Sequence, residues 1–166
     1  MIAVGELVQV LDEQTALVDE LIEVAERERA HLIAFEPHRI QACVEEKRAL
    51  LERERALEER RQVALASVLD ALGVSAEDAE TVDDLAALLP SHGGELRESA
   101  ARLRERVQAL GAHHAINQEH TERALRWVNA YVGVLRGAAE PTPTNRYAPS
   151  GRTATGGTAP TVNRRA

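Results

Sequence analysis

Apolar residues recur along most of the chain at the three- and four-residue spacing of amphipathic helices. The first such pattern runs from about Gly5 to Ala34. At 100° per residue its apolar side chains form a stripe about 120° wide, and a few further residues widen it. A stripe this wide predicts contact with two neighbouring helices. Its members are Leu7, Val8, Val10, Leu11, Leu17, Val18, Leu21, Ile22, Val24, Ala25, Leu32 and Ile33.

Pro37 interrupts this pattern. Proline lacks an amide donor but is favoured at the first helical position. The simplest interpretation is therefore a break at Phe35-Glu36 and a second helix from Pro37, and a kinked continuation is the alternative. Gly73 is expected to stop this second helix. Its apolar seam comprises Ile40, Cys43, Val44, Leu50, Leu51, Leu57, Leu65, Val68, Leu69 and Leu72.

A connection with its own short helix follows, over about residues 74–94. Thr81 and Asp84 have the spacing of a capping box, with Asp in place of Glu. Pro90 is expected to end this short helix, whose apolar face is Leu85, Leu88 and Leu89. A last helix is expected from about Glu95 to Arg136, and its seam begins with Leu96, Ala100, Leu103, Val107 and Leu110.

These elements predict an all-α protein: a long antiparallel helical hairpin, or a three-helix coiled-coil-like bundle, with a disordered C-terminal tail. We expect a helical domain over residues 1–136 and a Pro/Gly/Thr-rich basic tail over residues 137–166. The tail has too little apolar surface to offset the entropy of ordering, so it should be disordered when free.

Charge and composition exclude several functional classes. Residues 1–136 carry 26 acidic and 16 basic side chains, a balance of −10. This acidic body argues against general nucleic-acid binding. Cys43 is the only cysteine, so an internal disulfide is impossible and a cytoplasmic location is expected. The N-terminus lacks the basic region of a signal peptide, and no run is apolar enough to predict membrane insertion.

The end of the last helix, RWVNAYVGVLR over residues 126–136, contains two of the four aromatic residues. Its apolar arc is about 180° wide. A helix packed on one side needs only about 100°. Four residues would suffice for an internal seam: Leu125, Val128, Val132 and Leu135. Three large side chains are then surplus, namely Trp127, Tyr131 and Val134. They form a partner-binding surface, unless another helix of the protein covers them. The predicted site comprises Leu125, Trp127, Val128, Tyr131, Val134 and Leu135.

Upstream of this stretch the seam becomes polar, with His114, Asn117, Gln118 and Thr121. Such a layer fixes the register of packed helices or leaves them loosely packed. The alternative is that Asn117 and Thr121 form hydrogen bonds with a partner.

Two further histidines, His113 and His120, make a poor metal site, because no cysteine or carboxylate completes it. We find no nucleophile or phosphate-binding loop in a motif context, and we therefore expect neither an enzyme nor a cofactor.

In order, these features resemble the FlgN family of flagellar type III export chaperones. The run KRALLERERALEERR resembles the family's second-helix pattern through Lys47, Leu50, Leu51, Leu57, Glu58 and Arg61. Asn117 matches the first residue of an Asn-x-x-Asn element, and His120 stands in place of the second. Tyr147 and Gly151 match a Tyr-Gly-x-x-Gly element in the tail, with Ala148 in place of its first glycine.

The resemblance implies a cytoplasmic chaperone that works without ATP. It would bind the C-terminal helical segments of hook-filament junction (hook-associated) proteins, keep them soluble and deliver them to the type III export gate. Tyr147 is then a candidate contact for the export gate. The protein could be a monomer or a homodimer. The alternative is a coiled-coil scaffold or soluble export-apparatus component similar to the FliJ group, without a hydrophobic client groove.

Overall fold

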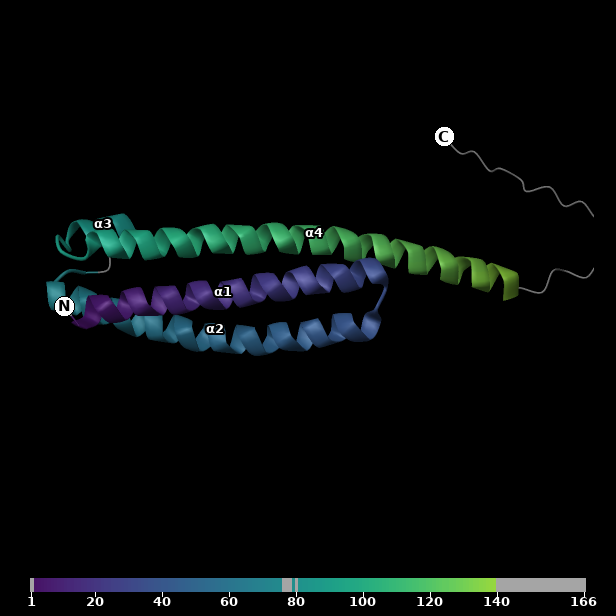
Figure 1. Cartoon of the computed structure of the whole chain (residues 1–166), viewed down its shortest axis with the longest axis horizontal. Helices are drawn as coiled ribbons and strands as arrows, with labels where there is room; N and C mark the ends of the chain where they lie inside the picture. The colour runs from purple at the N-terminus through teal and green to yellow at the C-terminus, as the bar shows by residue number, and fades with distance from the viewer. Residues whose placement is uncertain (1, 76–78, 80, 140–166) are drawn as a thin grey trace, which may run out of the picture. The chain divides into compact units, whose positions relative to one another are not determined.

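The structure is a computed structural model, and it describes residues 2–75, 79 and 81–139. It confirms the predicted all-α fold with long antiparallel helices packed together. In chain order, the helices are α1 (Ile2–Ala34), α2 (Pro37–Leu72), α3 (Val82–Ala87) and α4 (Gly93–Ala139) (Figure 1). The chain divides into two compact units, Met1–Asn129 and Ala130–Ala166, and the helical core belongs to the first.

The break before Pro37 is a true hairpin turn. Phe35 has a left-handed backbone with φ of 54°, and α2 begins with Pro37 in its first turn. The amide of Glu36 donates to the His31 carbonyl at 3.0 Å, and the Glu36 carbonyl accepts from the amide of Ile40 at 3.1 Å. The expected break is therefore confirmed, and the alternative of a kinked continuous helix is wrong.

The expected stop at Gly73 and the expected capping box are both present. Gly73 has φ of 64°, a left-handed conformation that glycine adopts at little cost, and its amide donates to the Asp70 carbonyl at 3.1 Å. At the start of α3, the Asp84 amide donates to the Thr81 hydroxyl at 3.1 Å, and the Thr81 amide donates to the Asp84 carboxylate at 3.0 Å. Local sequence signals thus set both boundaries.

Helix α1 lies between α2 and α4 in the first unit (Figure 1). Its wide apolar stripe therefore has two neighbours, as its width predicted. Two clusters of buried side chains form the core. One contains Val4, Leu7, Val8, Leu11, Ala64, Val68, Leu85, Ala86, Leu89, Leu96 and Ala100. The other contains Leu17, Leu21, Val24, Cys43 and Leu50, with Leu57 and Leu110 packed against it.

Ion pairs join α1 to both neighbours, because its acidic side chains meet arginines from either side. The pairs with α2 are Glu13–Arg60 at 2.6 Å and Glu20–Arg53 at 2.7 Å. The pairs with α4 are Asp12–Arg102 at 2.8 Å and Asp19–Arg106. These side chains are about half exposed, so each pair contributes little stability. Each pair joins specific positions on two helices, so a shift of one helix along its neighbour would separate the paired side chains.

Some apolar residues expected in the seams are exposed instead. Val44 and Leu51 follow the buried residues Cys43 and Leu50 directly. Adjacent residues of a helix point about 100° apart, so in each pair only one side chain faces α1. Ile33 and Val107 are likewise exposed. These assignments to the buried seams were wrong.

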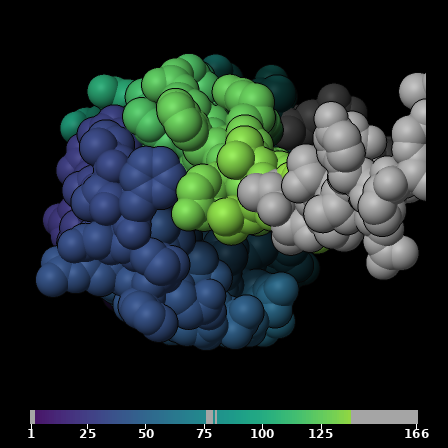
Figure 2. Space-filling view, turned by 90° about the vertical axis from the view of Figure 1, so that its right-hand side faces the viewer, coloured from purple at the N-terminus to yellow at the C-terminus, as the bar shows by residue number. Residues whose placement is uncertain are grey.

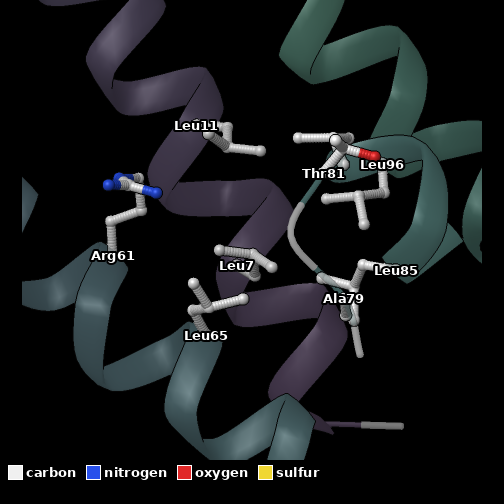
Figure 3. A pocket seen from close by; sticks show the side chains of 9 residues that line it. Leu7, Leu11, Arg61, Leu65, Ala79, Thr81, Leu85 and Leu96 are labelled. Carbon is white, nitrogen blue, oxygen red and sulfur yellow. The ribbon is translucent and has the colours of Figure 1, made fainter. Parts of the chain in front are cut away.

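Helix α3 and the start of α4 cover the end of the hairpin that holds the N-terminus (Figure 1). A cavity of about 130 Å³ remains there, and side chains from all four helices line it, Leu7, Leu65 and Leu85 among them (Figure 3). Gly93 allows the close approach of α4 to α3, because a Cβ atom there would lie 2.1 Å from the Ala86 carbonyl oxygen.

Candidate functional site

The surplus apolar residues near the end of α4 are exposed. Trp127 is 70% exposed and belongs to the first unit. Tyr131 and Val134, on the same helix, are 65% and 69% exposed and belong to the second unit. Large apolar side chains that stay exposed are typical of surfaces that bind a partner, and Trp and Tyr are enriched among the residues that dominate such binding.

The other half of the predicted site is exposed as well. Leu125, Val128 and Leu135 each expose more than half of their surface, although they were expected to suffice for an internal seam. That expectation was wrong. Helix α1 ends at Ala34, near the point where α4 reaches Trp127, so α1 has no further residues to pack against the α4 side chains of the first unit beyond it.

Trp127 borders a shallow groove of about 220 Å³ at the turn between α1 and α2. The groove lies at the end of the first unit where this turn meets α4 (Figure 2). We call it the hairpin-end groove. Its walls are Leu32, Ile33 and Phe35 on one side and Arg123, Ala124 and Trp127 on the other, with His120 beside them.

Sequence reasoning did not assign a role to Ile33 or Phe35 in this groove. Phe35 is the only phenylalanine of the chain and lies directly at the predicted break before Pro37. A bulky apolar residue at a turn was the sequence feature that could have indicated a binding surface there. Its proximity to Trp127 depends on the tertiary packing of α4 along α1, which the helical pattern does not specify.

Asn117 is buried and bonded to α1. Its side-chain amide donates to the Ala25 carbonyl at 2.8 Å and to the Glu28 carboxylate at 2.7 Å. Lys47 of α2 donates to the same carboxylate at 2.5 Å. One buried polar cluster, Glu28–Lys47–Asn117, therefore connects three helices. Such a cluster fits the interpretation that the polar layer sets helix register.

Asn117 also has one buried polar atom, its side-chain oxygen, without a hydrogen-bond partner among the described residues. Thr121 is exposed, and its hydroxyl donates to the Asn117 carbonyl at 2.9 Å. A binding partner could reach Thr121 without any rearrangement, whereas Asn117 is 5% exposed and would first have to leave its contacts with α1.

The remaining histidines of the polar layer do not converge on a metal site. The Nε2 atom of His113 lies 3.8 Å from the Oε1 atom of Glu26 in α1. Partial burial lowers the pKa of His114, and the nearby Lys47 lowers it further. Across the described part of the chain, no group of three or more potential metal ligands is found. Within the same residues, no helix is long and apolar enough to cross a membrane.

The charged run in α2 mainly organises the hairpin. Leu50 is buried in the core, and Lys47 binds Glu28 of α1. Arg61 donates two hydrogen bonds of 2.7 Å to Glu58. This pairing lowers the pKa of Glu58 to about 2. These contacts give the run a role in folding. Tyr147, the predicted contact for the export gate, lies outside the described residues.

A family model described as "FlgN protein" matches residues 1–155, which is most of the chain. No curated protein and no solved structure matches the chain. The match extends over all four helices, so it includes both the hairpin and the exposed end of α4.

Proposed function

The chain belongs to the FlgN family of cytoplasmic flagellar export chaperones for hook-associated proteins, and we propose that the exposed end of α4 binds these clients. The client segment is a C-terminal helix with an apolar face. The observation that carries this proposal is the exposure of Trp127 and Tyr131 in the free chain. The contact residues are Leu125, Trp127, Val128, Tyr131, Val134 and Leu135, with Thr121 as a polar neighbour.

The proposed mechanism is recognition of one helix by the apolar face of another. Trp and Tyr side chains combine a large apolar surface with a polar group, so they tolerate water when free and contribute strongly when buried. Client binding would cover these side chains and, in the client, the apolar face that otherwise promotes assembly. Capture of this kind needs no nucleotide hydrolysis, because burial of apolar surface supplies the free energy.

A calorimetric titration with client peptides tests this proposal. We expect a C-terminal helical peptide of a hook-associated protein to bind with a dissociation constant of roughly 1 μM or lower. The heat capacity change should be negative, because apolar surface is buried. A peptide of equal length from the N-terminal region of the same protein is the control. Binding of the full-length client without binding of the C-terminal peptide would contradict the proposal.

The alternative of a scaffold similar to the FliJ group is set aside, because the chain belongs to the FlgN family. Such a protein would bind partners along charged helix faces, whereas the ion pairs between α1 and its neighbours are formed within the chain itself. The exposed apolar end of α4 favours the chaperone, because a scaffold of this kind binds through charged faces and lacks a hydrophobic client groove. Partner binding that weakens steeply with salt and ignores changes at Trp127 would favour the scaffold.

Delivery to the export gate completes the proposed function. Tyr147 is the proposed gate contact, supported by its match to the tyrosine of the family's tail element. The proposal holds for a monomer or a homodimer, since the predicted client residues all belong to one helix.

A further inference from the structure

Phe35 has a backbone conformation that its side chain disfavours. Its φ of 54° lies in the left-handed region, where residues with a Cβ atom are strained and glycine or asparagine is favoured. Phe35 is 61% exposed and belongs to neither core cluster. In the free protein, the ring therefore offers no visible benefit to the fold that would offset this strain. Strain of this kind is a recurrent feature of binding sites.

The position of the Phe35 ring indicates a role in binding. Phe35 and Ile33 form one wall of the hairpin-end groove, and Trp127 and Ala124 form the other. Phe35, Ile33 and Trp127 are each at least 60% exposed. Three large apolar side chains thus surround an open groove that continues the exposed α4 surface within the first unit. An apolar side chain inserted here would contact both the turn and α4.

The α4 segment at this groove is less acidic than the rest of the body, because its acidic and basic side chains balance. From Glu119 to Trp127 the sequence has two arginines and two glutamates, in a chain of net charge −7. Arg123 lines the groove and pairs with Glu119 at 2.6 Å. Arg126, on the next turn, has no ion-pair partner among the described residues. A carboxylate on the ligand could pair with Arg126 here and would meet repulsion along most of the body.

We propose that the hairpin-end groove takes a large apolar side chain of the client helix, with Phe35 as a specificity-determining contact and Arg123 and Arg126 facing a client carboxylate. The occupant is therefore an amphipathic helix that carries an acidic residue beside its apolar face. This inference rests on the proposed function and extends the client surface from α4 to the α1–α2 turn.

Substitution of Phe35 by glycine separates binding from folding. Glycine adopts the left-handed conformation without strain, so Phe35→Gly should leave the midpoint of thermal unfolding unchanged or raise it. The same variant should bind the C-terminal client peptide about tenfold more weakly, because the ring is lost. Phe35→Asn, which also tolerates this conformation, should behave in the same way. Normal binding by both variants, or a lower unfolding midpoint in both, would overturn the role of the ring.

The charge requirement is tested with a peptide whose Asp and Glu residues are replaced by Asn and Gln. The wild-type protein should bind this amide peptide more weakly than the acidic one, and Arg126→Glu should remove the preference. Arg104→Glu on the same helix is the control, since Arg104 is exposed and should not affect it. Equal binding of both peptides by the wild-type protein would overturn the acidic part of the proposal.

Trp127→Ala distinguishes failure of this inference from failure of the proposed function. If the Phe35 variants bind normally and Trp127→Ala binds poorly, the α4 surface is correct and the groove is not used. If all three bind normally, the client site lies elsewhere and both proposals fail.

Discussion

Replacing Trp127 and Tyr131 together by alanine is expected to abolish capture of a hook-associated C-terminal peptide without changing the helix content. Both side chains are largely exposed, so their removal takes no packing from the core. Truncation of a dominant interface residue costs about 2 kcal/mol or more, and the two together should weaken binding about a thousandfold. Calorimetry measures the binding, and circular dichroism measures the helix content.

An apolar pair outside the proposed site provides the control. Leu51 and Val63 of α2 are also exposed, so Leu51→Ala with Val63→Ala removes exposed apolar surface at another place. This control should bind the peptide as the wild-type protein does. If the Trp127 and Tyr131 variant keeps wild-type affinity, or the control loses as much, the α4 site is not where the client binds.

Lys47→Met is expected to lower the free energy of unfolding by about 3 kcal/mol, at the lower end of the range for breaking a buried ion pair. The Glu28 and Lys47 side chains are only 12% and 17% exposed. Without the ammonium group, the Glu28 carboxylate would lose its cationic partner and keep the hydrogen bond from Asn117, at a site with little access to water. Urea unfolding, followed by circular dichroism, measures the change.

A double-mutant cycle shows whether the cost comes from the unpaired charge. Glu28→Leu combined with Lys47→Met removes both charges and should be more stable than Lys47→Met alone, because no carboxylate is left without its partner. Asn117 would still donate to the Ala25 carbonyl. A double variant less stable than Lys47→Met, or a Lys47→Met variant as stable as the wild type, would contradict this account of the cluster.

The helix boundaries could be predicted from the sequence because each has a local cause. Pro37, Gly73 and the Thr81–Asp84 pair each restrict the backbone of their own segment, and the structure has a boundary at every one of them. The wide apolar stripe of α1 likewise predicted two neighbours, since a stripe width reports how much of a helix is covered.

The remaining details depend on which helix faces which, and this is not a local property. The adjacent residues Cys43 and Val44 are both apolar, and only the packing of α1 decides that the first is buried. The exposure of Leu125 and Val128 depends on where α1 ends beside α4. The placement of Phe35 next to Trp127 also follows from this packing, which is why the hairpin-end groove was not predicted.

Acrylamide quenching of Trp127 fluorescence tests the central claim most directly, because this is the only tryptophan of the chain. If the client peptide contains no tryptophan, all tryptophan fluorescence of the complex comes from Trp127. In the free protein the exposed indole should be quenched efficiently, and in the saturated complex the quenching constant should fall several-fold. Equal quenching of the free protein and of the saturated complex would show that the client leaves Trp127 uncovered, and would contradict the account.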